Sequence, residues 1–425
     1  MAGEAFQKCA DYSKLAHEKA WRQAALPSAN LYAQKRITAL EQLPPTPEVQ
    51  LQRIDARTNH GMTLCIPGHF AEAKEAIAPI VEMTVKSNEK RPQAQVYFIL
   101  GSYQYTVKED FTIAFELLQK AIQSAEEAGD VFTATQAHVF YGLALCWHCQ
   151  FERGAEQIQK ALRINEAAQM LWGISFLKSN LSYYVYNYQG KVTEGFAHSL
   201  KALEIAEQSG DVFSQAVAYV CHGISCFYKG HFKTADEYLL KGLDLCEKIA
   251  LHAFSAAAHQ GLGYTWFEMG DYDKSRDHHR QAIQQRQQIG LFPSCINPNK
   301  MAEVRTALAA GNADWDIASL KQLISTNKLK LYHGAMARHL ADILFRLGDA
   351  YLAEAESWLQ VGMDDHEHLG MKWELASDYM LFAKLRKSEG RAEDEKNYVN
   401  KALSLFKECG AEGWCRQIET GCAEA

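Results

Sequence analysis

The sequence predicts an all-α fold, a right-handed α-solenoid of about ten helix pairs. Three observations lead to this prediction. A forty-residue repeat runs through Gly190, Gly230 and Gly270, a glycine opens a turn once in each repeat, and small residues recur at fixed distances from that turn. The period-2 alternation that is typical of strands does not interrupt the helical pattern. Because a repeat array grows by addition, all 425 residues can belong to one elongated body.

The turn that opens the second helix of each pair can be followed along most of the chain. Glu109 and Cys149 take the place of glycine at two turns, and the aromatic residues Phe111 and Phe151 keep the phase there. Small residues seven positions before the turn, such as Gly223, predict close helix crossings. The predicted turns lie at Gly68, Glu109, Cys149, Gly190, Gly230, Gly270, Gly311, Gly348 and Gly390, in steps of 41, 40, 41, 40, 40, 41, 37 and 42 residues.

The regularity of the repeat divides the chain into four predicted segments. Pro44 and Pro45 end a starting hairpin, because proline cannot donate into a helix. Pro293 and Pro298 precede the shortened step of 37 residues and predict a bend or a loose joint. The segments are a starting helical hairpin (1–45), a regular array (46–290), an irregular repeat or joint (291–330), and C-terminal repeats with a capping helix (331–425).

The charge and cysteine content argue against several classes of partner. The chain has 44 Lys and Arg against 51 Asp and Glu, interspersed, so no basic block offers a nucleic acid or an anionic membrane a binding surface. No apolar run approaches the roughly 20 residues that span a bilayer. An odd cysteine count of 11 without a secretory leader predicts a cytoplasmic protein with reduced thiols.

Clusters of potential metal ligands and nucleophiles have a structural interpretation. The sequence CWHC at 146–149 lacks a second Cys or His pair at zinc-site spacing, so we expect a structural role. His278, His279 and the sequence DDHEH at 364–368 are expected on solvated helix faces, because residues two apart on a helix point in different directions. We therefore predict no metal, no cofactor and no catalytic residue.

The repeat unit resembles the tetratricopeptide repeat. The sequence MGDYDKSRDHHRQAI at 269–283 matches that pattern, although the period is about 40 instead of 34 and the unit lacks its closing proline. This variant resembles the C-terminal superhelical region of bacterial signalling proteins, which include regulators like the maltose activator and proteins joining a nucleotide cyclase to an AAA/STAND-type ATPase. The stretches at 51–77 and 401–419 look like its opening and closing parts. Gly190 and Lys191 are followed by Val192, so they form no phosphate-binding loop.

The resemblance also places a candidate binding surface. In tetratricopeptide arrays the first helix of each pair lines the concave face, with ligand-facing positions about six, three and two residues before the turn. These positions are rich in aromatics, which bury much area and still offer a polar tip, and poor in Lys and Arg. A chaperone-type clamp on a terminal carboxylate is therefore not expected. The predicted partner-binding residues are Tyr103, Trp147, Tyr184, Asn187, Tyr188, Phe227, Tyr228, Tyr264 and Phe267.

Two functions are consistent with this surface. The first is a non-enzymatic scaffold or regulatory arm of a bacterial signalling or defence assembly that binds an apolar or helical segment of a protein or peptide partner. Such a partner could be a cyclase, an ATPase or another effector. The alternative is a receptor that closes its superhelix on a peptide or small molecule. It also remains open whether the aromatic rings bind a partner or pack against one another across the bore of the superhelix.

Overall fold

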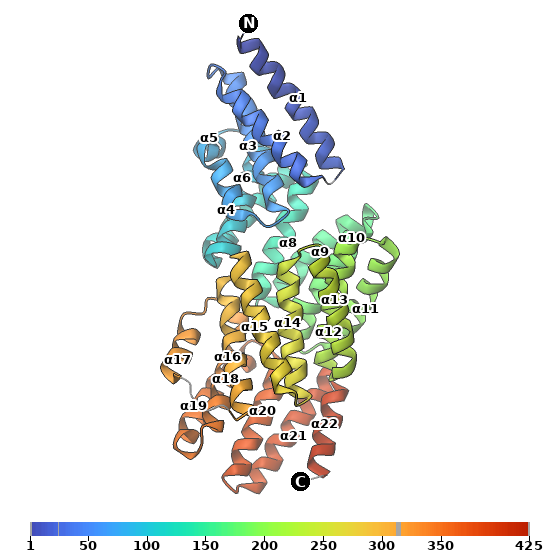
Figure 1. Cartoon of the computed structure of the whole chain (residues 1–425), viewed down its shortest axis with the longest axis vertical. Coiled ribbons are helices and arrows are strands. Elements are labelled where there is room, and N and C mark those ends of the chain that lie inside the picture. The colour runs from blue at the N-terminus through green and yellow to red at the C-terminus, as the bar shows by residue number, and fades with distance from the viewer. Residues whose placement is uncertain (1, 24, 312–315, 424–425) are drawn as a thin grey trace. The chain divides into compact units, whose positions relative to one another are not determined.

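In the computed structural model, the chain is helical and contains no strand within the residues that the structure describes, 2–23, 25–311 and 316–423 (Figure 1). The all-α prediction is confirmed. The chain forms two compact units, unit 1 (Met1–Ala144) and unit 2 (Leu145–Ala425). In those same described ranges, no helix combines the length and apolar character needed to cross a bilayer.

Unit 1 begins with antiparallel helix pairs, which Figure 1 shows in blue and cyan. Its elements are α1 (Ala2–Arg22), α2 (Leu26–Glu41), α3 (Pro47–Cys65), α4 (Phe70–Ile77), η1 (Ala78–Ile80), α5 (Val81–Lys86), α6 (Lys90–Tyr103), η2 (Gln104–Lys108) and α7 (Phe111–Glu127). Helix α8 (Val131–Trp147) begins in unit 1 and ends in unit 2.

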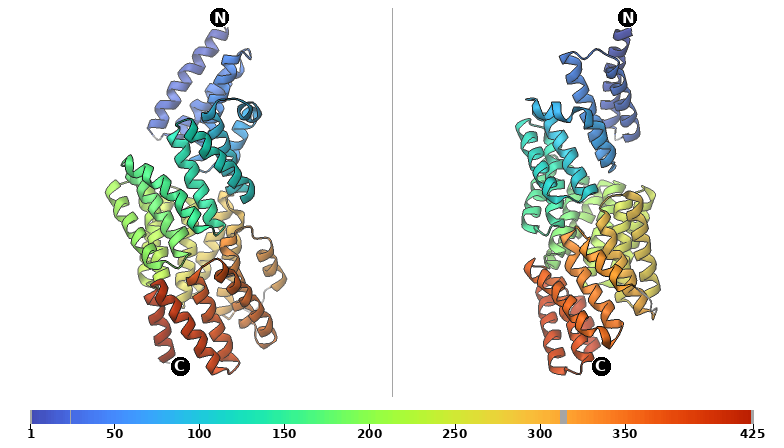
Figure 2. Two further views of the ribbon diagram at one scale, coloured as in Figure 1. Left: turned by 180° about the vertical axis from the view of Figure 1, so that it is seen from behind. Right: turned by 90° about the vertical axis from the view of Figure 1, so that its left-hand side faces the viewer.

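Unit 2 continues the same alternation of first and second helices, as the two views in Figure 2 show. Its elements are α9 (Phe151–Ala167), α10 (Leu171–Leu181), η3 (Ser182–Asn187), α11 (Val192–Ser209), α12 (Val212–Lys229), α13 (Phe232–Lys248), α14 (His252–Glu268), α15 (Tyr272–Ile289), η4 (Pro293–Cys295), α16 (Ile296–Ala309), α17 (Ile317–Ser325), α18 (Lys330–Arg346), η5 (Asp349–Tyr351), α19 (Leu352–His368), α20 (Lys372–Ser388), α21 (Ala392–Cys409) and α22 (Glu412–Ala423).

The predicted turn register agrees with the backbone at every turn. All the predicted turn positions have a left-handed φ, from 52° at Glu109 to 105° at Gly348. Glycine reaches this conformation without steric cost, whereas Glu109 and Cys149 adopt it against their own preference. The aromatics that kept the phase each begin a second helix, as Phe111 does for α7 and Phe151 for α9.

Two of the longer repeat steps have a structural cause. The segments η2 and η3 are π-helical, which adds a residue to the turn before Glu109 and before Gly190. Those two turns are the ones reached by steps of 41 residues from Gly68 and Cys149. In η3 the wider turn stacks the rings of Tyr183 and Tyr184, with centroids 4.2 Å apart.

The segment predicted as an irregular joint contains short elements. Pro293 begins η4, and Pro298 lies in the first turn of α16, where a missing N–H leaves no intrahelical bond unmade. Residues 312–315 of this segment lie outside the described residues. A loose joint at 291–330, like the other predicted segment boundaries, stays a prediction.

Glycine allows the close helix crossings that the sequence predicted. A Cβ placed on Gly223 of α12 would lie 2.7 Å from Leu239 Cγ and 3.0 Å from the Leu239 backbone nitrogen of α13. A Cβ on Gly263 of α14 would lie 2.7 Å from the ring of His279 on α15. The two helices of each of these pairs are therefore in contact through a position that has no side chain.

Replacing Gly223 with leucine is expected to destabilise unit 2 by about 1–3 kcal/mol or more, because overpacking a close crossing moves backbone as well as side chains. Gly3→Leu is the matched control, since a Cβ on this helical glycine meets nothing within 4 Å. Urea unfolding followed by circular dichroism gives the comparison. Equal stability of the two variants would contradict a close crossing at Gly223.

Candidate functional site

A cavity of about 450 Å³ lies inside unit 2. Successive first helices contribute to its wall, from η3 and α12 to α14, α16, α18 and α20, and α21 and α22 complete it. This agrees with the expectation that first helices line the inner face of the array. Its volume is within the range of 300–1,000 Å³ that is typical of small-ligand sites.

One side of the cavity is aromatic. Tyr228 of α12 packs against Trp373 of α20 with ring centroids 4.6 Å apart, and Phe227 packs edge-on against Trp414 of α22 at 5.6 Å. Burial, followed by the nearby Glu374 carboxylate, raises the pKa of Tyr228 well above its usual value, so its hydroxyl stays protonated. The aromatic residues lining the cavity are Tyr183, Tyr188, Phe227, Tyr228, Tyr264, Tyr332, Trp373, Phe406 and Trp414.

The cavity wall also carries paired charges from α16, α18 and α20, and the Tyr228 hydroxyl donates to one of them, the Glu374 carboxylate, at 3.3 Å. Arg338 donates to the Glu374 carboxylate at 2.6 Å and to Asp378 at 3.0 Å. Arg305 donates to Asp342 at 2.7 Å. Asp378 in turn accepts from or shares a proton with His366 Nδ1 at 2.6 Å, so a continuous polar network lies behind this wall.

These ion pairs fix the charge state of the buried groups. Burial alone would raise the pKa of Asp342, but the charges of Arg305 and Arg346 outweigh burial and hold that pKa well below its usual value. Burial, together with the positive charges of Arg305 and Arg338, lowers the pKa of His339 well below its usual value, so the imidazole is neutral. The wall thus presents ion pairs, neutral polar groups and the positively charged Lys384 side chain to the cavity.

The predicted partner-binding residues divide into two groups. Tyr188, Phe227, Tyr228 and Tyr264 line the cavity. The other five do not. Tyr103 lies in unit 1, Trp147 and Tyr184 pack against each other, Asn187 donates to Ser225, and Phe267 lies under the guanidinium of Arg305.

Some of the predicted binding residues pack against other rings in the interior of unit 2. The sequence by itself leaves this open as the alternative to partner binding. Trp147 is only 3% exposed, stacks on Phe292 at 4.8 Å and meets Tyr332 edge-on at 5.9 Å. Tyr188 stacks on Phe151 and packs edge-on against Tyr228. The Trp147 contacts join segments that are far apart in sequence, whereas those of Tyr188 join neighbouring repeats.

The predicted binding site did not include the charged wall, although the same counting rule places its residues on the inner face. Six residues before the turns at Gly311, Gly348 and Gly390 stand Arg305, Asp342 and Lys384, all of which line the cavity. Counting back from the turns does not place Trp373 or Trp414 on the cavity wall. They reach the cavity because the C-terminal helices of unit 2 lie against α12.

The expectation of solvated histidine faces is wrong at two positions. His279 is buried in the crossing of α14 and α15, and His366 is buried against Asp378. Each fills the space beside a glycine of the first helix of its pair, Gly263 and Gly334. In the CWHC segment, burial raises the pKa of the Cys149 thiol to about 12, so this thiol stays protonated. Within the described ranges, no three His, Cys, Asp or Glu residues are grouped as a metal site would require.

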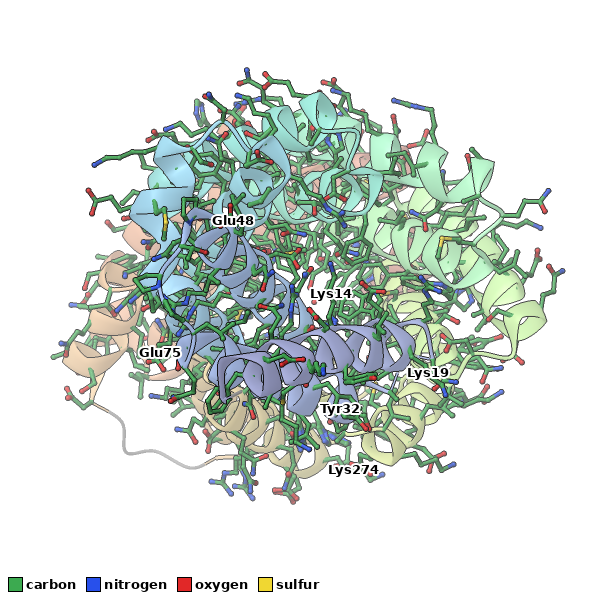
Figure 3. The ribbon with its side chains drawn as sticks, turned by 90° about the horizontal axis from the view of Figure 1, so that it is seen from above. Lys14, Lys19, Tyr32, Glu48, Glu75 and Lys274 are labelled. Atoms are coloured by element: carbon green, nitrogen blue, oxygen red, sulfur yellow. The ribbon has the colours of Figure 1, made fainter. Side chains whose placement is uncertain are left out.

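Unit 1 contains a smaller, polar cavity of about 350 Å³. Arg36 of α2 donates to Asp55 of α3 at 2.7 Å within it, and Arg91 of α6 lies 3.4 Å from Asp130. Lys14 of α1, which also lines it, is labelled in Figure 3. Several of its acidic and basic groups are thus paired, and its aromatic lining includes the edge-on ring pair of Trp21 and Phe132.

Comparison with known proteins supports the fold. Neither a protein-family model nor a curated protein matches the sequence. Among solved structures, a Rap protein complexed with competence and sporulation factor has a TM-score of 0.58 at 16% identity, covering 95% of this chain and 99% of that chain. The Rap conjugation gene regulator of plasmid pLS20, in complex with a Phr peptide, has a TM-score of 0.56 at 15% identity over 87% and 95% of the chains. The human IFIT1 dimer with PPP-AAAA has a TM-score of 0.50 at 14% identity over 92% and 81%. This likeness confirms a tetratricopeptide-like helical-repeat fold.

Proposed function

We propose that this chain is a non-enzymatic regulatory protein that receives a peptide, or an extended segment of a protein partner, in the cavity of unit 2. The observation that supports this proposal most is the cavity itself, which is lined by successive first helices and carries both aromatic rings and ion-paired groups on its wall. Aromatic anchors in a concave, desolvated site supply most of the binding energy in many interfaces. No catalytic group or cofactor is part of the proposal.

The lining favours an uncharged, apolar segment. Arg305 and Arg338 are each engaged with carboxylates, so neither needs an anionic ligand to neutralise it. Gln260, Tyr264 and His339 are uncharged groups on the wall that can donate to or accept from a peptide backbone. The backbone amides of a bound peptide can form hydrogen bonds with these groups, and its apolar side chains can pack against the aromatic rings.

The similar structures bear on the ligand only by analogy. Two of them were determined with a factor or a peptide bound. Because this chain also has a cavity of suitable size, we prefer a peptide to other ligands. IFIT1 was determined with PPP-AAAA, but the paired arginines of this cavity do not favour a phosphate chain. A cyclase, an ATPase or another bacterial signalling effector in the cytoplasm is the proposed recipient of the regulation.

Filling the cavity should abolish peptide binding while leaving the fold intact. Ala335 lines the cavity and is half-buried, so Ala335→Trp is expected to occupy the space a ligand needs. A pool of short synthetic apolar peptides, tested by thermal shift, should stabilise the unmodified chain and leave this variant unchanged. Ala353→Trp, at an exposed position of α19, is the matched control and should respond like the unmodified chain. Equal responses of both variants, or stabilisation only by anionic peptides, would contradict the proposal.

A further inference from the structure

The C-terminal helices of unit 2 are bonded to the end of α12, although more than a hundred residues separate them in sequence. The indole of Trp373 donates to the carbonyl of Tyr228 at 3.1 Å, and the indole of Trp414 donates to the carbonyl of Phe227 at 2.9 Å. The last carbonyls of a helix lack intrahelical partners, so they are available acceptors. Two tryptophans from α20 and α22 are thus bonded to the end of α12, and the Phe227 carbonyl also accepts from the Gly230 N–H at 2.8 Å.

A charged contact reinforces the same junction. The ammonium of Lys229, at the end of α12, donates to the Gly410 carbonyl at 2.9 Å and to both carboxylate oxygens of Glu412 at 2.9 and 3.0 Å. Gly410 is the C-cap residue of α21, and Glu412 begins α22. A cation at the end of one helix therefore meets the negative end of a second helix and the first carboxylate of a third.

The junction is also a direct contact between two backbones. A Cβ on Gly230 would lie 2.4 Å from the Trp414 nitrogen, and a Cβ on Gly413 would lie 2.4 Å from the Gly230 oxygen. Such an approach is possible only without side chains at both positions. The glycine that opens the repeat turn therefore also serves as the surface on which α22 sits.

The α20 and α22 parts of this junction differ in their exposure to water. Trp373 and Glu374 of α20 are buried, and Glu374 is held by Arg338. In α22, by contrast, Trp414 is half-buried and the Glu412 side chain is 49% exposed. Lys229 itself is only 10% exposed, so water and salt reach this ion pair at its Glu412 end, whereas the Arg338–Glu374 pair is shielded at both ends. The contact of α22 with α12 is accordingly the part of the junction that separates at the lower cost.

We propose that α22 is a detachable latch on the cavity of unit 2. Trp414, Gln417 and Ile418 of α22 form part of the cavity wall, so separation of α22 from α12 opens the aromatic side to solvent. The latch controls ligand access and thus rests on the proposed function for its biological meaning. Its opening is a property of the free chain and can be measured without any peptide.

Reversing the charge of Glu412 tests the latch. In Glu412→Lys the substituted side chain repels Lys229, and the loss of a charge-assisted contact should increase opening about tenfold or more. Hydrogen exchange of α22 and of the end of α12 should accelerate by that factor, and anilinonaphthalenesulfonate should enter the cavity correspondingly faster. Glu419→Lys is the matched control, because its partner Lys407 lies on the adjacent α21 and not on α12. Lys229→Glu combined with Glu412→Lys should restore slow exchange in part.

Covalent closure gives the opposite perturbation in the unmodified chain. Carbodiimide converts the Glu412 carboxylate to an O-acylisourea. Lys229, whose nitrogen lies 2.9 Å from that carboxylate, gives up a proton to the buffer and attacks the acyl carbon, so that an amide forms and the urea leaves. Chains carrying this cross-link, verified by mass spectrometry, should take up the dye at least tenfold more slowly. Unchanged dye entry in both the cross-linked chain and Glu412→Lys would overturn the latch, even if hydrogen exchange of α22 changed. That result would leave the peptide test with Ala335→Trp unaffected, so failures of the two proposals are distinguishable.

Discussion

Lowering the pH from 6.5 to 4 is expected to destabilise unit 2 steeply, because several of its histidines are buried in the neutral form. Burial is the main cause that lowers the pKa of His222, His259 and His279 to about 4. In the unfolded chain a histidine accepts its proton near pH 6.5. Between these values the unfolded chain binds more protons than the folded chain, so the free energy of unfolding decreases as the pH falls.

The expected loss of stability follows from the difference between the folded and unfolded pKa values of each histidine. Each pH unit between the folded and unfolded pKa is worth about 1.4 kcal/mol for one histidine, or about 3 kcal/mol over the whole window. Asp342 contributes a further loss of stability only below about pH 4, because its carboxyl group in the unfolded chain is protonated there. His333 acts in the opposite direction, since its hydrogen bond to Asp365 raises its pKa.

Urea unfolding at several pH values between 7.5 and 4 measures this dependence. His222→Gln should flatten the slope by about one proton, since glutamine can still bond to Ser199 but does not titrate. His69→Gln is the matched control, because the side chain of His69 is 54% exposed in the folded chain. A pH dependence that His222→Gln and His69→Gln change equally would show that buried neutral histidines are not its source.

Trp147→Ala is expected to lower the free energy of unfolding by about 3–5 kcal/mol, the cost typical of deleting a buried aromatic side chain. Its ring fills the space between Tyr184, Phe292 and Tyr332. Trp172→Ala is the matched control, because that tryptophan of α10 is 43% exposed. The control should change stability by about 0.5 kcal/mol or less.

Comparison of stability with peptide binding then separates packing from recognition. Tyr188 and Tyr228 are buried and also line the cavity, so their alanine variants should lose both stability and binding. Tyr264, which is half-buried on the cavity wall, should lose binding with the smallest loss of stability. If Trp147→Ala unfolds like Trp172→Ala, the ring is not part of the core and the predicted binding role of Trp147 becomes the better interpretation.

The repeat register was predictable from sequence because its causes are local. A left-handed turn residue followed by an aromatic helix start identifies each pair, and this pattern found Glu109 and Cys149 without a glycine to mark them. Even the π-helical turn of η3 left a signal, the extra residue between Cys149 and Gly190. The same counting placed Tyr188 and Tyr264 on the inner face, where they line the cavity.

The features decided by tertiary structure depend on how small rotations between neighbouring repeats add up. Whether α22 reaches α12 depends on that sum, and no local pattern around Trp373 or Trp414 contains it. The burial of His366 likewise depends on the glycine it faces on α18, not on its own helix. A sequence specifies each unit and its contact with the next, because these involve residues within one repeat length. Contacts across the bore join residues many repeats apart, so only the assembled unit determines which rings fill the interior and which line a cavity.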